Sequence, residues 1–431
     1  MGKKFVFVLI LLSFCVSAKA QFHSLGADPA SVRWHQIETS HYKVIYPAFA
    51  DSLARTYAAG LERFYPYEAL SSGLTPTKVF KKKFPVILHT YDTNSNGMVV
   101  WAPRRIDLLT IPDQGYGRSM SWTTDLTVHE SRHLSQMMMG YNNWLKYFRF
   151  IFGDGAASVA TGLYHKTYWM EGDAVMAETG LTQAGRGRSW NFQQYNIMAW
   201  DKGDTRSFAR WLFGSNKNNT PNHYAFGYLY LGSIRALYNE PMLTSRYLKQ
   251  ADNPLHLNMN GATILEVTGK REFSPELWKQ IVDWNVEEFR KRKDARGPFQ
   301  KLDTIMVNKS KWYAEYTNSA IVGHYLYAMK ESKERAFQFV RIDLRTGEEL
   351  VLRAFSSTTN CLAYDEYTKK IFWSEHTPTM WDLRVDSRIL YYDPEKDSFG
   401  YLTDRKHILQ NPTPAEGFLV AIEYFHDGSY A

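Results

Sequence analysis

The spacing of apolar residues changes twice along this chain of 431 residues. Up to residue 111, most short apolar runs are separated by turn residues, which is the pattern of β-strands. From Trp122 to about Arg290, apolar residues recur every three or four positions, as they do in helices that bury one face. After Gly297, short β-branched and aromatic runs return and continue to the end. We therefore predict an α+β protein in which strands, helices and strands follow one another.

The predicted elements divide into three groups. Strands at 34–46, 84–91, 98–101 and 106–111, with a helix at 48–70, indicate a small mixed sheet. The strongest helices are predicted at 124–139, 168–178, 224–238 and 275–293. A chain of this length exceeds the size of one hydrophobic core. We expect one domain at 21–300 and a β-rich module at 301–431, divided near residues 295–305.

The first 20 residues read as a signal peptide. Lys3 and Lys4 precede an apolar run from Phe5 to Phe14, and Ala18-Lys19-Ala20 offers a small-x-small cleavage site before Gln21. The alternative is a retained membrane anchor, but the apolar run is short for one. We expect an exported protein that is periplasmic, associated with the outer membrane or secreted.

Charge and cysteine content argue against a nucleic-acid-binding protein and against a protein held together by disulfides. Removing the three lysines of residues 1–20 lowers the formal charge from +7 to +4, and no block of Lys and Arg marks a nucleic-acid face. Only Cys361 remains after this removal, so no internal disulfide is expected. The segment from Trp144 to Tyr164 is the most apolar, but Lys146, Arg149 and Asp154 interrupt it. We interpret it as a buried helical hairpin and expect no transmembrane segment after signal removal.

One motif on a predicted helix points to metal chemistry. His129-Glu130-Ser131-Arg132-His133 has the pattern H-E-x-x-H, and histidines four residues apart on a helix can reach one Zn²⁺. Glu130 is rotated off their line, where it can take a proton from a zinc-activated water that attacks a carbonyl. The alternative is two helix histidines beside a surface glutamate.

A third zinc ligand follows later in the chain. Glu171, in Trp169-Met170-Glu171-Gly172-Asp173-Ala174, comes 38 positions after His133. Catalytic zinc sites have three protein ligands and one open position. Glu171 could instead be a first-turn glutamate favoured by the helix dipole. After an H-E-x-x-H motif, we favour the ligand and predict a site for one Zn²⁺.

H-E-x-x-H followed by W-x-E-G-x-A resembles the gluzincin metallopeptidases, particularly the peptidase MA-like group and more distantly the relatives of aminopeptidase N. The resemblance covers about residues 30–290 and implies a thermolysin-like domain with Glu171 as third ligand. It also implies that Tyr224, in Tyr224-Ala225-Phe226-Gly227, stabilises the oxyanion. A core tyrosine is the alternative for Tyr224.

Two departures from the gluzincin pattern bear on function. The gap before Glu171 is long, so residues 140–168 would be an insertion that lines the cleft. The strand Asn96-Gly97-Met98-Val99-Val100 lacks the glutamate that holds a free amine in aminopeptidase N relatives, which favours an endopeptidase. This strand could still pair with an extended peptide.

Charged residues around Glu171 have open roles. Arg186 and Arg188 could bind a substrate carboxylate, but a loop tied to the protein surface is the favoured interpretation. Asp173 or Glu178 could orient the histidines, and the sequence does not choose between them.

The β-rich tail carries a weak repeat. Asp343 and Asp393, 50 residues apart, each end a β-branched or aromatic run before a turn. Residues 303–431 hold two to three blades of ~40–50 residues, whereas a propeller needs ~4–8. We predict an all-β, incomplete propeller module; similar exported bacterial proteins join a gluzincin-like domain to TolB-like propeller repeats.

Together these features predict an exported zinc endopeptidase that acts on a peptide or protein, with no nucleic-acid partner. The alternative is a catalytically inactive scaffold that binds an envelope protein through the β-rich module.

Overall fold

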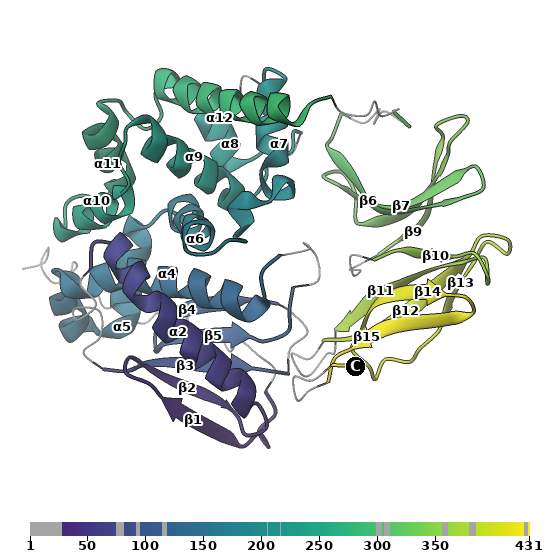
Figure 1. Ribbon diagram of the computed structural model, residues 1–431, viewed down its shortest axis with the longest axis horizontal. Coiled ribbons are helices and arrows are strands. Elements are labelled where there is room, and N and C mark those ends of the chain that lie inside the picture. The colour runs from purple at the N-terminus through teal and green to yellow at the C-terminus, as the bar shows by residue number, and fades with distance from the viewer. Residues whose placement is uncertain are drawn as a thin grey trace, which may run out of the picture.

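The computed structural model shows strands, helices and strands in the predicted order (Figure 1). It describes residues 28–431 except 75–81, 92–94, 114–118, 205, 216, 299–303, 306–310, 356–360, 379–384 and 426–429, and the side chains of 139–142, 377, 378 and 385. The predicted signal peptide lies outside the described residues. Helix α12 (Pro275–Arg296) ends and strand β6 (Ala314–Val322) begins on either side of the expected domain division, which stays a prediction.

The first part of the fold is a five-stranded mixed sheet in the order β1-β2-β3-β5-β4. Its strands are β1 (Trp34–Glu38), β2 (Tyr42–Pro47), β3 (Phe84–His89), β4 (Gly97–Trp101) and β5 (Arg104–Leu109). Strands β2, β3 and β5 run parallel, while β1 and β4 are antiparallel at the two edges. Helices α2 (Asp51–Ser71) and α4 (Trp122–Asn142) bury an apolar stripe against the sheet. Strand β4 therefore borders the region that α4 covers (Figure 1).

A helical layer follows the sheet. It contains α5 (Leu145–Tyr164), α6 (Thr167–Leu181), α7 (Trp190–Asp201), α8 (Phe208–Phe213), α9 (His223–Leu237), α10 (Leu243–Lys249), α11 (Met259–Thr268) and α12. The bounds of α6, α9 and α12 are close to the predicted ones. Asn222 caps α9 by accepting a hydrogen bond from the N–H of Ala225 at 3.3 Å. A separate core, rich in aromatic residues, joins these helices.

Helices α6 and α9 cross with their backbones in contact because each has a glycine at the crossing. A Cβ on Gly172 would overlap the backbone of Gly227, and a Cβ on Gly227 would overlap the carbonyl oxygen of Tyr168. Gly172 follows Glu171 directly, and Gly227 is the last residue of the motif Tyr224-Ala225-Phe226-Gly227. The crossing therefore brings the start of α9 close to the start of α6, where Glu171 lies.

Replacing Gly227 by Ala is expected to destabilise the protein by about 1–3 kcal/mol, because the added methyl forces the two helices apart. Gly232 in the same helix is the matched control, since a Cβ there meets only the methyl of Met176 at 4.0 Å. Gly232→Ala should stabilise the helix by up to about 1 kcal/mol. Urea unfolding measures both, and equal effects of the two variants would show that the crossing is not tight.

The segment from Trp144 to Tyr164 is not the buried hairpin that we predicted. Helix α5 is broken at Gly153, where φ is +82° and ψ is 172°. Ala157 and Tyr164 on one side are buried, but several large apolar side chains on the other side are exposed. The burial prediction is wrong because only one side of this helix has a neighbour to pack against. None of the described helices combines the length and apolar character needed to cross a bilayer.

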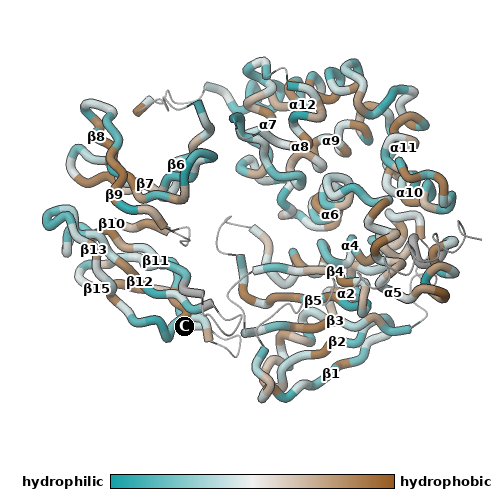
Figure 2. Tube along the Cα trace, turned by 180° about the vertical axis from the view of Figure 1, so that it is seen from behind, coloured by the Kyte–Doolittle hydropathy of each residue, from teal (hydrophilic) through white to brown (hydrophobic). Residues whose placement is uncertain are grey.

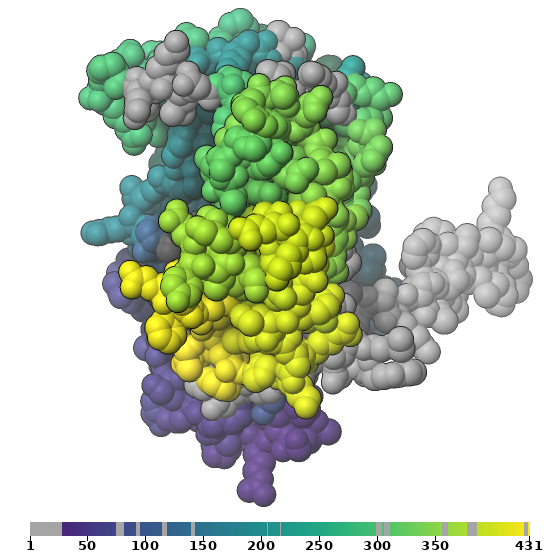
Figure 3. All heavy atoms as spheres, turned by 90° about the vertical axis from the view of Figure 1, so that its right-hand side faces the viewer, coloured from purple at the N-terminus to yellow at the C-terminus, as the bar shows by residue number. Residues whose placement is uncertain are grey.

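The C-terminal part consists of antiparallel sheets stacked one below another (Figure 1). In the space-filling view their atoms run from green at the top to yellow below (Figure 3). The first contains β6, β7 (Tyr325–Ser332), β8 (Gln338–Asp343) and β9 (Glu349–Ala354). The second contains β10 (Ala363–Asp365), β11 (Lys370–Pro378), β12 (Val385–Asp393) and β13 (Ser398–Tyr401). A pair of strands follows, β14 (Leu409–Ala415) and β15 (Phe418–Glu423). Side chains of both four-stranded sheets share one core.

The 50-residue repeat has a structural basis. Asp343 ends β8 and Asp393 ends β12, and each is the third strand of its sheet. The Oδ1 atoms accept turn N–H groups, from Arg345 at 2.8 Å and from Glu395 at 3.1 Å. Aspartate is favoured at such turns because its side chain can replace a backbone acceptor. Within the described residues the sheets do not close into a propeller ring.

Candidate metal centre

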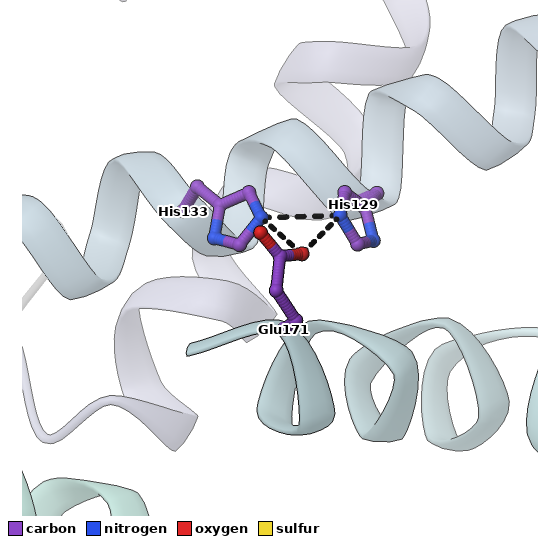
Figure 4. A group of neighbouring side chains, drawn as sticks. All are labelled: His129, His133 and Glu171. Carbon is purple, nitrogen blue, oxygen red and sulfur yellow. Dashed lines mark hydrogen bonds and ion pairs between the residues drawn. The ribbon is translucent and has the colours of Figure 1, made fainter. Parts of the chain in front are cut away.

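Two helices, α4 and α6, supply the three residues predicted to bind zinc. His129 and His133 lie one turn apart on α4 and point toward Glu171 on α6 (Figure 4). Glu171 lies in the second turn of α6, which begins at Thr167, so it is not a first-turn glutamate. The three residues form a buried or half-buried group that could hold a metal ion.

The ligand atoms lie slightly closer together than in a tetrahedral zinc site. Glu171 Oε2 lies 3.2 Å from His129 Nε2 and 3.1 Å from His133 Nε2. The two Nε2 atoms are 3.1 Å apart. Zinc bonds of about 2.0–2.2 Å at tetrahedral angles separate neighbouring ligand atoms by roughly 3.3–3.6 Å. A metal ion therefore fits between the three atoms after small adjustments.

Hydrogen bonds to the other ring nitrogens orient both histidines. His129 Nδ1 lies 2.7 Å from Glu178 Oε1, and His133 Nδ1 lies 2.9 Å from Gln136 Oε1. The amide nitrogen of Gln136 donates to Asp173 Oδ2 at 2.8 Å, which directs its oxygen toward His133. His133 Nδ1 is thus positioned to donate to an amide oxygen and His129 Nδ1 to a carboxylate, and Nη2 of Arg186 also lies 3.0 Å from His129 Nδ1.

This arrangement leaves three electron-pair donors facing one another. With the protons of His129 and His133 on Nδ1, each Nε2 presents a lone pair to the other and to the carboxylate of Glu171. Three such atoms at 3.1–3.2 Å repel one another unless a metal cation lies between them or, without a metal, an Nε2 is also protonated and donates to Glu171. The donor set of two imidazoles and one carboxylate suits zinc, although it does not by itself identify the metal.

The charges around the centre favour a cation. Burial disfavours a charged imidazole, but hydrogen bonds to Glu171 and Glu178 outweigh it and raise the pKa of His129 to about 9. Burial also opposes ionisation of Glu171, yet the charge of His133 and the hydrogen bonds from both histidines hold the pKa of its carboxyl far below its usual range. The negative potential that produces these shifts would also attract a divalent cation.

Glu130 lies beside the three ligands and is not one of them. It is 3% exposed, its Oε2 accepts no hydrogen bond from any described residue, and burial raises the pKa of its carboxyl. Its carboxylate packs against β4, where a Cβ on Gly97 would come within 2.6 Å of Oε1. The glycine at the start of β4 therefore makes room for this carboxylate at the wall of the cleft.

Tyr224 and Arg186 complete the group. Tyr224 lies in the first turn of α9, and its ring stacks on that of His129 with centroids 6.0 Å apart. Burial, followed by the charge of Glu171, raises the pKa of its hydroxyl, which stays protonated. The guanidinium of Arg186 lies 5.1 Å from the centre of the Tyr224 ring and donates to Glu178, with Nε to Oε2 at 3.0 Å.

The structure distinguishes the roles of the charged residues around Glu171 that the sequence left open. Glu178 contacts His129 directly, whereas Asp173 acts on His133 only through Gln136. Arg188 donates to backbone carbonyls, as expected of a loop tied down locally, but Arg186 reaches into the cleft. Gln136 was not among the predicted site residues. Its place three residues after His133 on the same helix was the available signal.

Arg132, inside the H-E-x-x-H motif, was also missed. It is 2% exposed and points away from the metal centre into a polar network between three helices. Its guanidinium donates to Asp173 Oδ2 at 2.6 Å, to Glu68 Oε2 at 3.3 Å and to Ser72 Oγ at 2.8 Å. Arg132 therefore ties α4 to α2 and α6.

The centre opens into a cleft of about 690 Å³. Strand β4, helix α4 and the start of α9 line it, together with the end of α5 through Ser158, Thr161 and His165. Residues of the segment 140–168 thus contribute to the cleft wall, as predicted. Its lining is about equally polar and apolar, with Met98, Leu126 and Met170 on the apolar part.

No protein-family model, curated protein or solved structure matches this chain. The resemblance to gluzincin peptidases therefore rests on the motifs and on the geometry of the centre.

Proposed function

We propose that this protein is an exported zinc endopeptidase that hydrolyses peptide bonds in the cleft beside β4. The observation that carries the proposal is the convergence of His129, His133 and Glu171, with both histidines held so that Nε2 faces the carboxylate. Glu130 and Tyr224 border the same cleft, where they could act as proton acceptor and oxyanion donor. The leader-like N-terminus supports export.

The three ligands would hold the ion, and Glu130 and Tyr224 would act on the reactants. When bound, zinc polarises a carbonyl and lowers the pKa of a coordinated water. The unpartnered Oε2 of Glu130 is available to accept a proton from the nucleophile and return it to the leaving amine. The protonated hydroxyl of Tyr224 can donate to the oxygen on which negative charge develops.

Strand β4 supports an extended peptide as the substrate. It pairs with β5 on one side and is an edge strand on the other. Gly97, Met98 and Val99 of this strand line the cleft. An edge strand offers backbone N–H and C=O groups that can pair with an added strand, while the cleft accommodates alternate side chains. The strand has no acidic side chain to hold a free amine, so we favour cleavage within chains.

Removing the metal should abolish hydrolysis reversibly. We expect a chelator to reduce cleavage of a mixed peptide library by at least about 10²-fold, because the ligands alone cannot polarise a carbonyl. One equivalent of Zn²⁺ should restore it. Mass spectrometry of the peptides and elemental analysis of the protein measure the two quantities.

The same experiment distinguishes the alternative function. A protein that binds one equivalent of zinc but cleaves no peptide of the library would be a binding scaffold. A protein that cleaves equally with and without metal would contradict the proposed role of the centre.

A further inference from the structure

Helix α5 exposes an apolar face. Tyr147, Phe150, Ile151, Val159 and Leu163, which we call the α5 face, are all exposed to solvent. Phe150 is 91% exposed and Ile151 is 69% exposed. Single exposed apolar residues are common on proteins, but a contiguous group of this size marks an interaction surface.

Helical spacing groups these residues into two patches, one on each side of the break at Gly153. Tyr147, Phe150 and Ile151 have the spacing i, i+3, i+4 and share one side of the first half of α5. Val159 and Leu163, four residues apart, share one side of the second half, and Thr161 lies on the packed side. The apolar stripe that normally faces a core is directed to solvent in α5.

The α5 face continues onto a neighbouring loop. The hydroxyl of Tyr164, at the end of α5, donates to the carbonyl of Pro254 at 2.7 Å. Next to this contact, Leu255 is 85% exposed and Leu257 is also exposed. Figures 1 and 2 show α5 at the edge of the molecule, on the side opposite the C-terminal sheets.

The charges beside the α5 face are mostly positive. Lys146 is exposed, and Arg149 and Arg104 lie 3.7 and 3.8 Å from Asp154. These three cations and one carboxylate give a local charge of about +2. Protruding aromatic and aliphatic side chains flanked by Lys and Arg are typical of helices that lie in a membrane interface.

We propose that the α5 face binds the surface of a membrane that contains anionic lipid. The apolar side chains would enter the boundary between headgroups and acyl chains, and Lys146 and Arg149 would contact anionic headgroups. A fluid interface can accommodate side chains that protrude as far as Phe150 does. The helix would lie on the bilayer, since no described helix can cross one.

The proposal does not depend on peptidase activity, but it has a consequence for the cleft. Ser158 and Thr161, on the packed side of α5, line the cleft wall. A membrane bound to the opposite side of the same helix would lie close to the cleft. Peptide segments near the membrane surface would then be the accessible ones.

Vesicle flotation tests the proposal. The sample is the protein purified in the form in which its host cells contain it. The probes are vesicles of phosphatidylcholine alone and vesicles in which one third of the lipid is phosphatidylglycerol. We expect the parent to float with the anionic vesicles and the double variant F150S/I151S to bind at least about tenfold more weakly. F418S/V420S is the matched control, because Phe418 and Val420 are exposed residues of β15, far from α5, and it should bind like the parent.

Zinc content and thermal unfolding of each variant check that the fold is retained. Two results together would support the proposal. F150S/I151S should lose flotation while the control keeps it, and high salt should weaken the binding of the parent to anionic vesicles. It is overturned if the parent does not float with either vesicle, or if F150S/I151S floats like the parent. It is also overturned if the parent ignores vesicles but forms a dimer in sedimentation equilibrium that F150S/I151S abolishes, since the α5 face would then join two copies of this chain.

Discussion

Replacing Glu130 by Gln is expected to reduce peptide hydrolysis by about 10²–10⁴-fold while zinc content stays unchanged. The amide has nearly the same size as the carboxylate, so it fits in the space that Gly97 leaves. It cannot accept the proton of the nucleophile. The three ligand atoms belong to other residues, so the coordination of the metal is kept.

Two further variants control this experiment. His133→Ala should lose both metal and activity, because it removes a ligand. Glu287→Gln makes the same chemical change on an exposed side chain of α12 and should leave both unchanged. The assignment of Glu130 as proton acceptor is wrong if Glu130→Gln cleaves peptides at the parental rate with zinc bound.

Replacing Arg132 by Met is expected to destabilise the fold by about 3–5 kcal/mol. The change leaves the carboxyl groups of Asp173 and Glu68 buried without the cation that lies between them. Burial already raises the pKa of Glu68 to about 7 against the opposing charge of Arg132, so removing that charge should raise it further. The free energy of unfolding, measured in urea, reports the loss.

The matched control is Arg55→Met on the surface of α2. Arg55 forms an ion pair with Asp51 at 2.7 Å, but both side chains are exposed and the pair is screened by solvent. This variant should unfold at nearly the parental urea concentration. If Arg132→Met is no less stable than Arg55→Met, the buried network does not hold α2, α4 and α6 together.

The order of elements and the core of the metal centre could be predicted from the sequence. Apolar periodicity is a local property, so the helices at 124–139, 168–178, 224–238 and 275–293 lie within a few residues of their observed bounds. The pairing of His129 with His133 is local for the same reason, because a helix places residues i and i+4 on one side. The repeat of Asp343 and Asp393 predicted equivalent strands, which the two sheets contain.

The predictions that failed concern which side of a segment has a neighbour. The periodicity of α5 is that of a helix with a buried face, yet Phe150 and Ile151 face solvent because no other element covers them. Arg186 was expected on the surface, but the fold places Glu178 beside it in the cleft. Periodicity says which residues share a face and does not say what lies opposite that face.

Only the tertiary structure decided how the centre is assembled. Glu171 reaches the histidines because Arg132 ties α4 to α6, while Gly172 and Gly227 let α6 and α9 cross closely and bring Tyr224 to the same cleft. The sequence alone determined that His129 and His133 share one side of α4, because they are one helical turn apart. The third ligand and the hydrogen bonds that orient His129 and His133 come from contacts between residues 38 or more positions apart, with Gln136 the exception. Such contacts depend on the packing of whole helices, which no local pattern of residues specifies.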